Sequence, residues 1–258
     1  MTDSILLAVE DGLARITLNR PERYNAVNLE MALGWEKVAL EVAERDDVRA
    51  VLIDAEGKAF CAGGDLMSIA DRIDDGSSIT HLAHVIHRGQ AALLRSTKPV
   101  VAAVQGAVAG GGLGLFLSTD YAVASETAVF ASRYGNIGLT PDMSVSTHLS
   151  RAIGERRALQ LLLQDITLTA AEALDWGLVA EVVPAEQVAD RALEVARFWL
   201  DGSARAYGEA KRLVRTASDR PLEANLDDEA DTIGRMLVTP EAQARISAFV
   251  EQSRARGR

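Results

Sequence analysis

The chain has 258 residues, of which 48% are hydrophobic and 25% charged, and its formal net charge is −10. This composition is typical of a globular protein with a sizeable core, and the acidic charge argues against nucleic acid as a partner. Charged residues interrupt every apolar run before it reaches the roughly 20 residues that cross a membrane, so no membrane partner is expected. The single cysteine excludes an internal disulfide framework. Together with an amino terminus that lacks signal-peptide features, it predicts a cytoplasmic protein.

Strands and helices are predicted to alternate along most of the chain, with a hairpin turn at Asp11-Gly12 and a helix end at Gly177. Apolar runs indicate strands at 5–10, 13–18, 48–54, 99–104, 121–124, 128–130 and 179–183. Helices are indicated at 29–45, from 66, and at 79–94, 107–117, 143–152, 154–163 and 170–176. Four more are predicted at 185–200, 203–217, 222–237 and 241–254. We therefore expect an α/β core over residues 1–199 and a helical oligomerisation region over 200–258.

Two glycine-bearing turns connect predicted strands to predicted helices, at Gly63-Gly64 and at Gly110–Gly112. Glycine lets the backbone approach a ligand closely, and the first N–H groups of a helix have no partner within it. Such a turn can hold an anion or a developing oxyanion. The alternative is that the glycines only allow tight packing. The second turn contains no G-x-G-x-x-G pattern, and no Gly-Lys-Ser/Thr follows it, so neither a dinucleotide nor a phosphate loop is indicated.

Single polar side chains are ambiguous when pattern alone is considered. Asp142 fits the N-cap of the helix that follows it. Cys61 has small apolar neighbours, which favour a buried, unreactive thiol over a nucleophile. His81, His84 and His87 recur at steps of three, a spacing that drifts around a helix. Three histidines at this spacing cannot all point toward one metal ion, so no metal site is expected.

Four motifs occur together and in order: Leu18–Asn25, Ala59–Asp65, Lys98–Gly106 with Ala109–Gly112, and Leu174–Val179. At this spacing they resemble the crotonase superfamily, also called the enoyl-CoA hydratase/isomerase family, over nearly the whole chain. The resemblance implies an α/β spiral of ββα units followed by a C-terminal helical trimerisation region. It also implies a homotrimer or homohexamer that binds an acyl-CoA thioester. Coenzyme A would be part of that substrate, with no separate cofactor.

The resemblance also assigns roles to individual residues. The main-chain N–H groups of Gly64 and Gly111 would hold the thioester oxygen as an enolate forms. Arg23 matches a position near the CoA phosphates. Phe249 matches a phenylalanine that reaches the CoA of a neighbouring subunit in some members, although the lysine usual after it is replaced by Gln252. The substrate-binding residues implied are Arg23, Ala62, Asp65, Gly110 and Phe249.

Two departures from the family pattern bear on the chemistry. Hydratases of this family carry two glutamates that position and activate water, and the same positions hold Gly114 and Tyr134 here. Because addition of water by general acid–base catalysis needs such a carboxylate pair, efficient hydration is not expected. Tyr134 could either donate a hydrogen bond to the substrate or simply line the pocket.

Asp142 is the acidic residue that remains for catalysis. The segment Gly138–Asp142 matches the Gly-Leu-x-Pro-Asp of family members that resemble ring-1,2-epoxyphenylacetyl-CoA isomerase, in which the aspartate moves a proton. We therefore predict an isomerase with Asp142 as base. In the 4-chlorobenzoyl-CoA dehalogenase branch the aligned aspartate is a nucleophile and a histidine falling on His87 is the base. That branch has aromatic residues at the positions of Gly64 and Tyr134, the second of them a tryptophan. A third alternative is a CoA-binding member without efficient catalysis.

Overall fold

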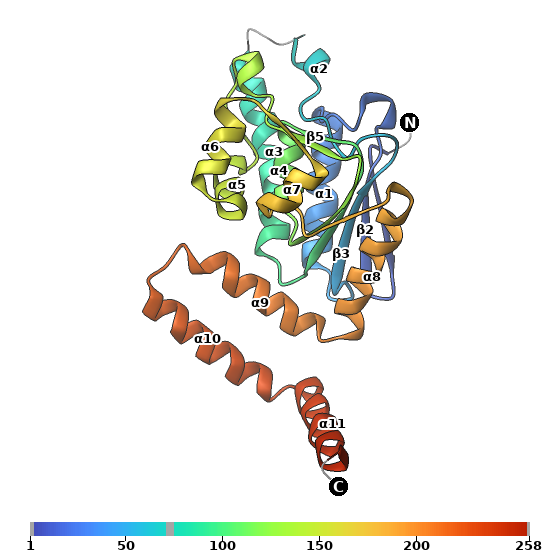
Figure 1. Ribbon diagram of the computed structural model, residues 1–258, viewed down its shortest axis with the longest axis vertical. Helices are drawn as coiled ribbons and strands as arrows, with labels where there is room; N and C mark the ends of the chain where they lie inside the picture. The colour runs from blue at the N-terminus through green and yellow to red at the C-terminus, as the bar shows by residue number, and fades with distance from the viewer. Residues whose placement is uncertain (1–2, 71–74, 257–258) are drawn as a thin grey trace.

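A six-stranded sheet forms the centre of the computed structural model, which describes residues 3–70 and 75–256 (Figure 1). Its strand order is β1-β2-β3-β4-β6-β9, with β1 and β2 antiparallel and every other neighbouring pair parallel. The hairpin turns at Asp11 and Gly12, which both have positive φ, and this confirms the predicted turn. The strands are β1 (Ile5–Glu10), β2 (Leu13–Leu18), β3 (Ala50–Ala55), β4 (Val100–Val104), β6 (Tyr121–Ser125) and β9 (Glu181–Val183).

Helices cover both faces of this sheet. On one face lie α1 (Leu29–Glu44), α3 (Gly76–Arg95) and α4 (Gly111–Leu117), and on the other lies α8 (Val188–Asp201). The connecting helices are α2 (Leu66–Ala70), α5 (Val145–Ile153), α6 (Glu155–Leu163) and α7 (Ala170–Trp176). α7 ends at Gly177 with a left-handed φ of 79°, as predicted.

A second, three-stranded sheet corrects the prediction of one long helix from residue 107. It consists of β5 (Ala107–Ala109), β7 (Val129–Ala131) and β8 (Thr167–Thr169), in the order β5-β7-β8. Ala107–Ala109 is extended because it pairs with β7 and also exchanges backbone hydrogen bonds with Cys61. The helix α4 therefore begins only at Gly111, after this strand has brought the glycines beside the loop of Cys61.

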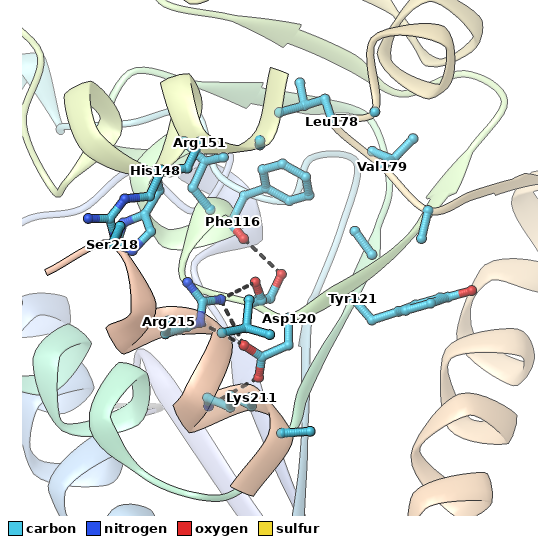
Figure 2. A pocket seen from close by; sticks show the side chains of 18 of the residues that line it. Phe116, Asp120, Tyr121, His148, Arg151, Leu178, Val179, Lys211, Arg215 and Ser218 are labelled. Atoms are coloured by element: carbon cyan, nitrogen blue, oxygen red, sulfur yellow. Dashed lines mark hydrogen bonds and ion pairs between the residues drawn. The ribbon is translucent and has the colours of Figure 1, made fainter. Parts of the chain in front are cut away.

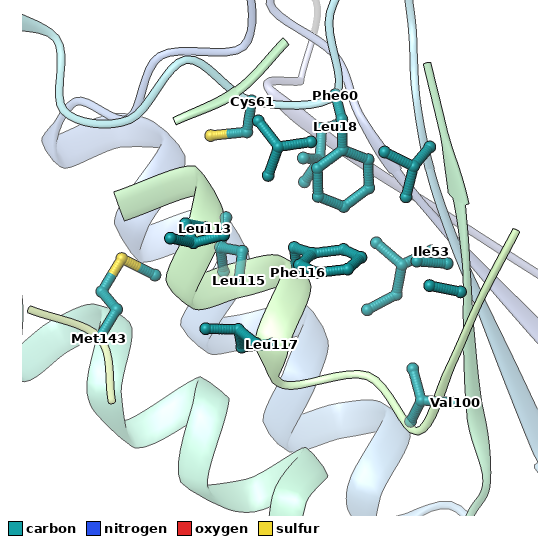
Figure 3. Packing of buried hydrophobic residues seen from close by; sticks show 14 of the residues in the cluster. Leu18, Ile53, Phe60, Cys61, Val100, Leu113, Leu115, Phe116, Leu117 and Met143 are labelled. Atoms are coloured by element: carbon teal, nitrogen blue, oxygen red, sulfur yellow. The ribbon is translucent and has the colours of Figure 1, made fainter. Parts of the chain in front are cut away.

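The short helix α4 is buried in the core rather than lying on the surface. Its residues from Gly112 to Leu117 are all buried, which explains their almost wholly apolar composition. Figure 3 shows Phe116 pointing from α4 toward Ile53 and Phe60. The ring of Phe116 also packs 5.2 Å, centroid to centroid, from that of Phe130. This packing gives the amino end of α4 a fixed place in the fold.

The last three helices extend away from the sheet (Figure 1). They are α9 (Ala204–Ala217), α10 (Leu222–Leu237) and α11 (Pro240–Arg256). α9 is docked on the core where Gly208 meets the carbonyl oxygen of Thr97, since a Cβ there would lie only 1.6 Å from that oxygen. Arg212 of α9 binds Asp228 of α10 at 2.6 Å. In the part of the chain that the structure describes, no helix is long and apolar enough to span a bilayer.

Candidate active site

The two glycine turns lie against each other. A Cβ added at Gly63 would lie 3.2 Å from the amide nitrogen of Gly111, and one added at Gly111 would lie 3.9 Å from the carbonyl carbon of Gly63. Gly63 and Gly110 have φ values of 102° and 51°, which L side chains rarely adopt. Among the described residues, no acceptor is found for the N–H groups of Gly64 and Gly111. Two main-chain donors thus stand at adjoining turns, an arrangement that can hold an oxyanion.

Asp65 holds the first of these turns in place. Its buried carboxylate pairs with Arg20 at 3.0 Å and accepts the backbone N–H of Ser68 at 3.4 Å. Burial disfavours the charge of Asp65, but the hydrogen bonds from Arg20 and Ser68 outweigh it and lower the pKa of the carboxyl group. Asp65 therefore stabilises the backbone next to Gly64, while Ala62, earlier in the same turn, is exposed.

His87 of α3 contacts Asp142, which lies in the turn before α5. Nε2 of His87 lies 2.7 Å from Oδ1 of Asp142, although the two residues are far apart in sequence. Their side chains are 40% and 41% exposed, so a bound substrate can reach both. This contact distinguishes His87 from His81 and His84 of the same helix, which are exposed. A carboxylate held by an imidazole can act as a general base or as a nucleophile.

The prediction that Asp142 caps a helix beginning at Met143 is wrong. Helix α5 begins at Val145 after Ser144, and the Asp142 carboxylate turns to His87 instead. Met143 and Ser144 have φ values of 53° and 61°. Each non-glycine residue in this left-handed region costs about 1–2 kcal/mol. The two residues reverse the chain just after Asp142, and tertiary contacts must hold them there.

Gln90 is a residue of this region that sequence reasoning missed. It lies one turn beyond His87 on α3, is 3% exposed, and its Nε2 is 2.8 Å from the carbonyl oxygen of Met143. A glutamine within an amphipathic helix is most often solvated, so the sequence around Gln90 does not indicate that this side chain is buried. Its spacing of three from His87 is the one feature that could have suggested a shared face.

Gly114 and Tyr134 occupy the two positions at which hydratases of the family carry glutamates. A Cβ added at Gly114 would lie 2.4 Å from the Cβ of Met143 and 2.6 Å from the carbonyl oxygen of Met143. The position therefore has no room for any side chain larger than that of glycine. Tyr134 is 8% exposed, and its hydroxyl has no hydrogen-bond partner among the described residues. Burial raises the pKa of Tyr134, and the nearby charge of Asp142 adds to the effect. The phenol therefore stays neutral and can donate a hydrogen bond.

Three other predicted residues are placed as follows. Cys61 is fully buried, its thiol contacts the carbonyl oxygen of Asn25 at 3.1 Å, and burial raises its pKa to about 12. This confirms a structural thiol rather than a nucleophile. Arg23 is exposed at the end of a single 3-10 turn. Phe249 is 70% exposed on α11, which Figure 1 places at the opposite end of the molecule from α2, so the chain does not bring Phe249 to its own site.

A cavity of about 700 Å³ lies apart from these residues, between the core and α9 (Figure 2). At its base, Asp120 binds Arg215 at 2.7 Å and Lys211 at 3.1 Å, and it accepts the backbone N–H of Val100 at 2.9 Å. Burial lowers the pKa of Lys211. Because these charges are engaged with one another, we assign them to the docking of α9 rather than to acid–base chemistry.

Comparison with known proteins shows which family this chain is similar to. The family model described as enoyl-CoA hydratase/isomerase matches residues 8–256. The chain is 35% identical to 1,2-epoxyphenylacetyl-CoA isomerase of Escherichia coli, over 90% of this chain and 89% of that protein. It is 32% identical to 4-chlorobenzoyl coenzyme A dehalogenase-2 of an Arthrobacter species, over 93% and 87%. The crystal structure of an enoyl-CoA hydratase from Polaromonas sp. JS666 superposes with a TM-score of 0.90 at 31% identity, covering 96% of this chain and 97% of that one.

Proposed function

The chain belongs to the enoyl-CoA hydratase/isomerase family and has the crotonase fold, and on this basis we propose that it shifts a carbon–carbon double bond in an acyl-CoA thioester. The observation that carries the proposal is the Asp142 carboxylate, held by His87 at 2.7 Å and exposed to a ligand. It supports a reaction that needs one base. The relative named an epoxyphenylacetyl-CoA isomerase agrees with this choice.

The proposed reaction moves one proton and one double bond. Asp142 takes a proton from the carbon next to the thioester carbonyl of a 3-enoyl substrate, and the electron pair passes to the thioester oxygen. The N–H groups of Gly64 and Gly111 stabilise that oxygen as a dienolate forms. Protonated Asp142 then returns the proton to the γ-carbon, so the double bond moves into conjugation and the carboxylate is regenerated. No water or cofactor is consumed.

The residues around Asp142 are better suited to double-bond isomerisation than to hydration. Tyr134 and His87 are side chains near the Asp142 carboxylate that can donate hydrogen bonds, and neither is a second carboxylate of the kind that hydratases of the family use. The space at Gly114 is filled by Met143. A catalytic carboxylate therefore has no room at the position where hydratases of the family carry one, which supports proton shuttling by Asp142 alone.

Hydrolytic dehalogenation of an aryl-CoA is the second candidate, because the same His87–Asp142 contact would serve it. Asp142 would attack the halogen-bearing ring carbon, chloride would leave, and an aryl ester would form. Water deprotonated by His87 would then attack the ester carbonyl, releasing the hydroxyaryl thioester and free Asp142. Gly64 offers no aromatic wall for a benzoyl ring, so we rank this candidate below isomerisation.

Proton NMR in D₂O would test the two reactions side by side. The wild-type protein is incubated separately with a 3-enoyl-CoA, a 2-enoyl-CoA and 4-chlorobenzoyl-CoA. We expect deuterium incorporation next to the thioester and a shift of the double bond with the enoyl substrates. Conversion of the chloroaryl signals would instead favour dehalogenation. Binding without change in any of the three would contradict catalysis on these acyl groups and favour a CoA-binding role.

We also propose that the protein works as a homotrimer or homohexamer in which Phe249 approaches the CoA of a neighbouring subunit. Large apolar side chains stay exposed on α10 and at the residue after it in the single chain, including Leu222, Ile233, Leu237 and Val238 at 55–72% exposure. Apolar surface of this extent favours association. Light scattering on the purified protein should give three or six times the chain mass of 27.6 kDa, and a monomer would contradict the proposal.

A further inference from the structure

We infer that Gln90 is a positioning residue that holds the turn carrying Asp142 against His87. The catalytic part of this inference rests on the proposed function, but the placement of Asp142 is a structural property that does not. Gln90 follows His87 by three residues on α3, so the two side chains leave the same face of the helix. The helix is itself seated closely on α1, since a Cβ added at Gly89 would lie 2.9 Å from the Cα of Glu36.

The buried carboxamide of Gln90 joins three elements of the site. Its Nε2 lies 2.8 Å from the carbonyl oxygen of Met143 and 2.9 Å from Oγ of Ser144. The same nitrogen lies 3.1 Å from the carbonyl oxygen of Gly114 and 2.6 Å from Oγ of Ser118, both on or next to α4. One amide therefore connects the helix of His87, the turn after Asp142 and the helix that begins at Gly111.

The turn depends on such an anchor because of its backbone. Met143 and Ser144 are two consecutive non-glycine residues with positive φ, directly after Asp142. A conformation of this kind persists only where surrounding contacts hold it. Nδ1 of His148 also contacts Oγ of Ser144 at 2.7 Å, but His148 belongs to α5, the helix that follows the turn, and so does not connect the turn to α3. Gln90 ties Met143 and Ser144 of the turn to α3, the helix that carries His87.

Gln90 is placed to act through Asp142 rather than on a substrate. It is 3% exposed, and within the described residues its side chain forms no hydrogen bond with the Asp142 carboxylate or the His87 ring. Loss of the amide would release the turn and let Asp142 leave His87. The donors at Gly64 and Gly111 would stay, so affinity for the thioester should change little.

The test is Gln90→Met, which keeps most of the side-chain volume and removes the donor. Because a misplacement of about 1 Å can reduce turnover about 100-fold, we expect kcat to fall by roughly 10- to 100-fold while KM stays within about threefold. In the free protein, the Cε1–H resonance of His87 should move, and a crystal structure should show the Asp142 carboxylate displaced from Nε2. The chain has only four histidines, so His87→Gln assigns the resonance.

Ser118→Ala is the matched control. Ser118 is 1% exposed and also contacts Nε2 of Gln90, but it does not touch the turn. Its loss should leave kcat and the His87 resonance near wild type. If Gln90→Met does not fold, Gln90→Asn replaces it, since the shorter amide keeps a donor but cannot span from Met143 to Gly114, and a partial loss of kcat is expected.

Two results would overturn the inference: full kcat in Gln90→Met, or a reduced kcat with the His87 resonance and the His87–Asp142 distance unchanged. The first of these includes a variant that is less thermally stable but keeps full kcat, because Gln90 would then be a purely structural residue. If the wild-type protein turns over no thioester, the proposed function fails separately. The resonance and the crystal structure of Gln90→Met would then still decide whether Gln90 places Asp142.

Discussion

Replacement of Asp142 by asparagine should lower kcat of double-bond isomerisation by about 10²- to 10⁴-fold, the usual contribution of a general base. Asparagine has nearly the same shape and can keep the contact with His87, but its amide cannot accept the substrate proton. Asp142 does not cap α5, so the helix should be unaffected. KM for the acyl-CoA should stay close to the wild-type value because Gly64, Gly111 and Arg23 are unchanged. Steady-state kinetics and deuterium exchange in D₂O give both quantities.

Asp175→Asn is the control for this experiment, since the Asp175 carboxylate is 75% exposed on α7 and forms a surface ion pair with Arg157. It should retain wild-type kcat. If Asp142→Asn keeps more than a third of the activity, another group removes the proton and the isomerase mechanism is wrong. His87→Gln separates the two candidate reactions further. Dehalogenation should stop without the base that activates water, whereas isomerisation should be slowed but not abolished.

Gly114→Ala is the second change with a large expected effect. Alanine is normally favoured over glycine in a helix by about 1 kcal/mol, but here its Cβ would lie 2.4 Å from Cβ and 2.6 Å from the carbonyl oxygen of Met143. Overpacking of this kind typically costs 1–3 kcal/mol. Met143 is the neighbour of Asp142, so relief of the clash moves the base. We expect a loss of about 1–3 kcal/mol in the free energy of unfolding and about a 100-fold loss in kcat.

Urea unfolding and kinetics of the same preparation measure both effects. Gly234→Ala on α10 is the control, because a Cβ there meets nothing within 4 Å. It should be neutral or slightly stabilising, with unchanged kcat. Wild-type stability together with wild-type kcat in Gly114→Ala would show that Met143 gives way without moving Asp142. The same clash predicts that Gly114→Glu, even combined with Tyr134→Glu, does not create an efficient hydratase.

Local signals in the sequence determined most of the secondary structure of this protein. The strands at 5–10 and 13–18, the turn at Asp11-Gly12 and the helices at 170–176 and 222–237 agree with the structure residue by residue. Apolar periodicity, turn glycines and helix ends are set by neighbours within a few residues, so they can be read from a single chain. The motifs also marked both glycine turns and the absence of the two hydratase glutamates.

The tertiary structure alone decided which side chains form the site. Ala107–Ala109 became a strand because β7 and Cys61 were available to pair with it, not because of its own sequence. From its local sequence, Asp142 could equally have capped the helix that follows it. It contacts His87 instead because the tertiary structure brings α3 close to it. The place of Gln90 and the filled space at Gly114 depend on contacts between residues 24 to 54 positions apart. Contacts at such separations depend on how whole elements pack, and no local pattern encodes that packing.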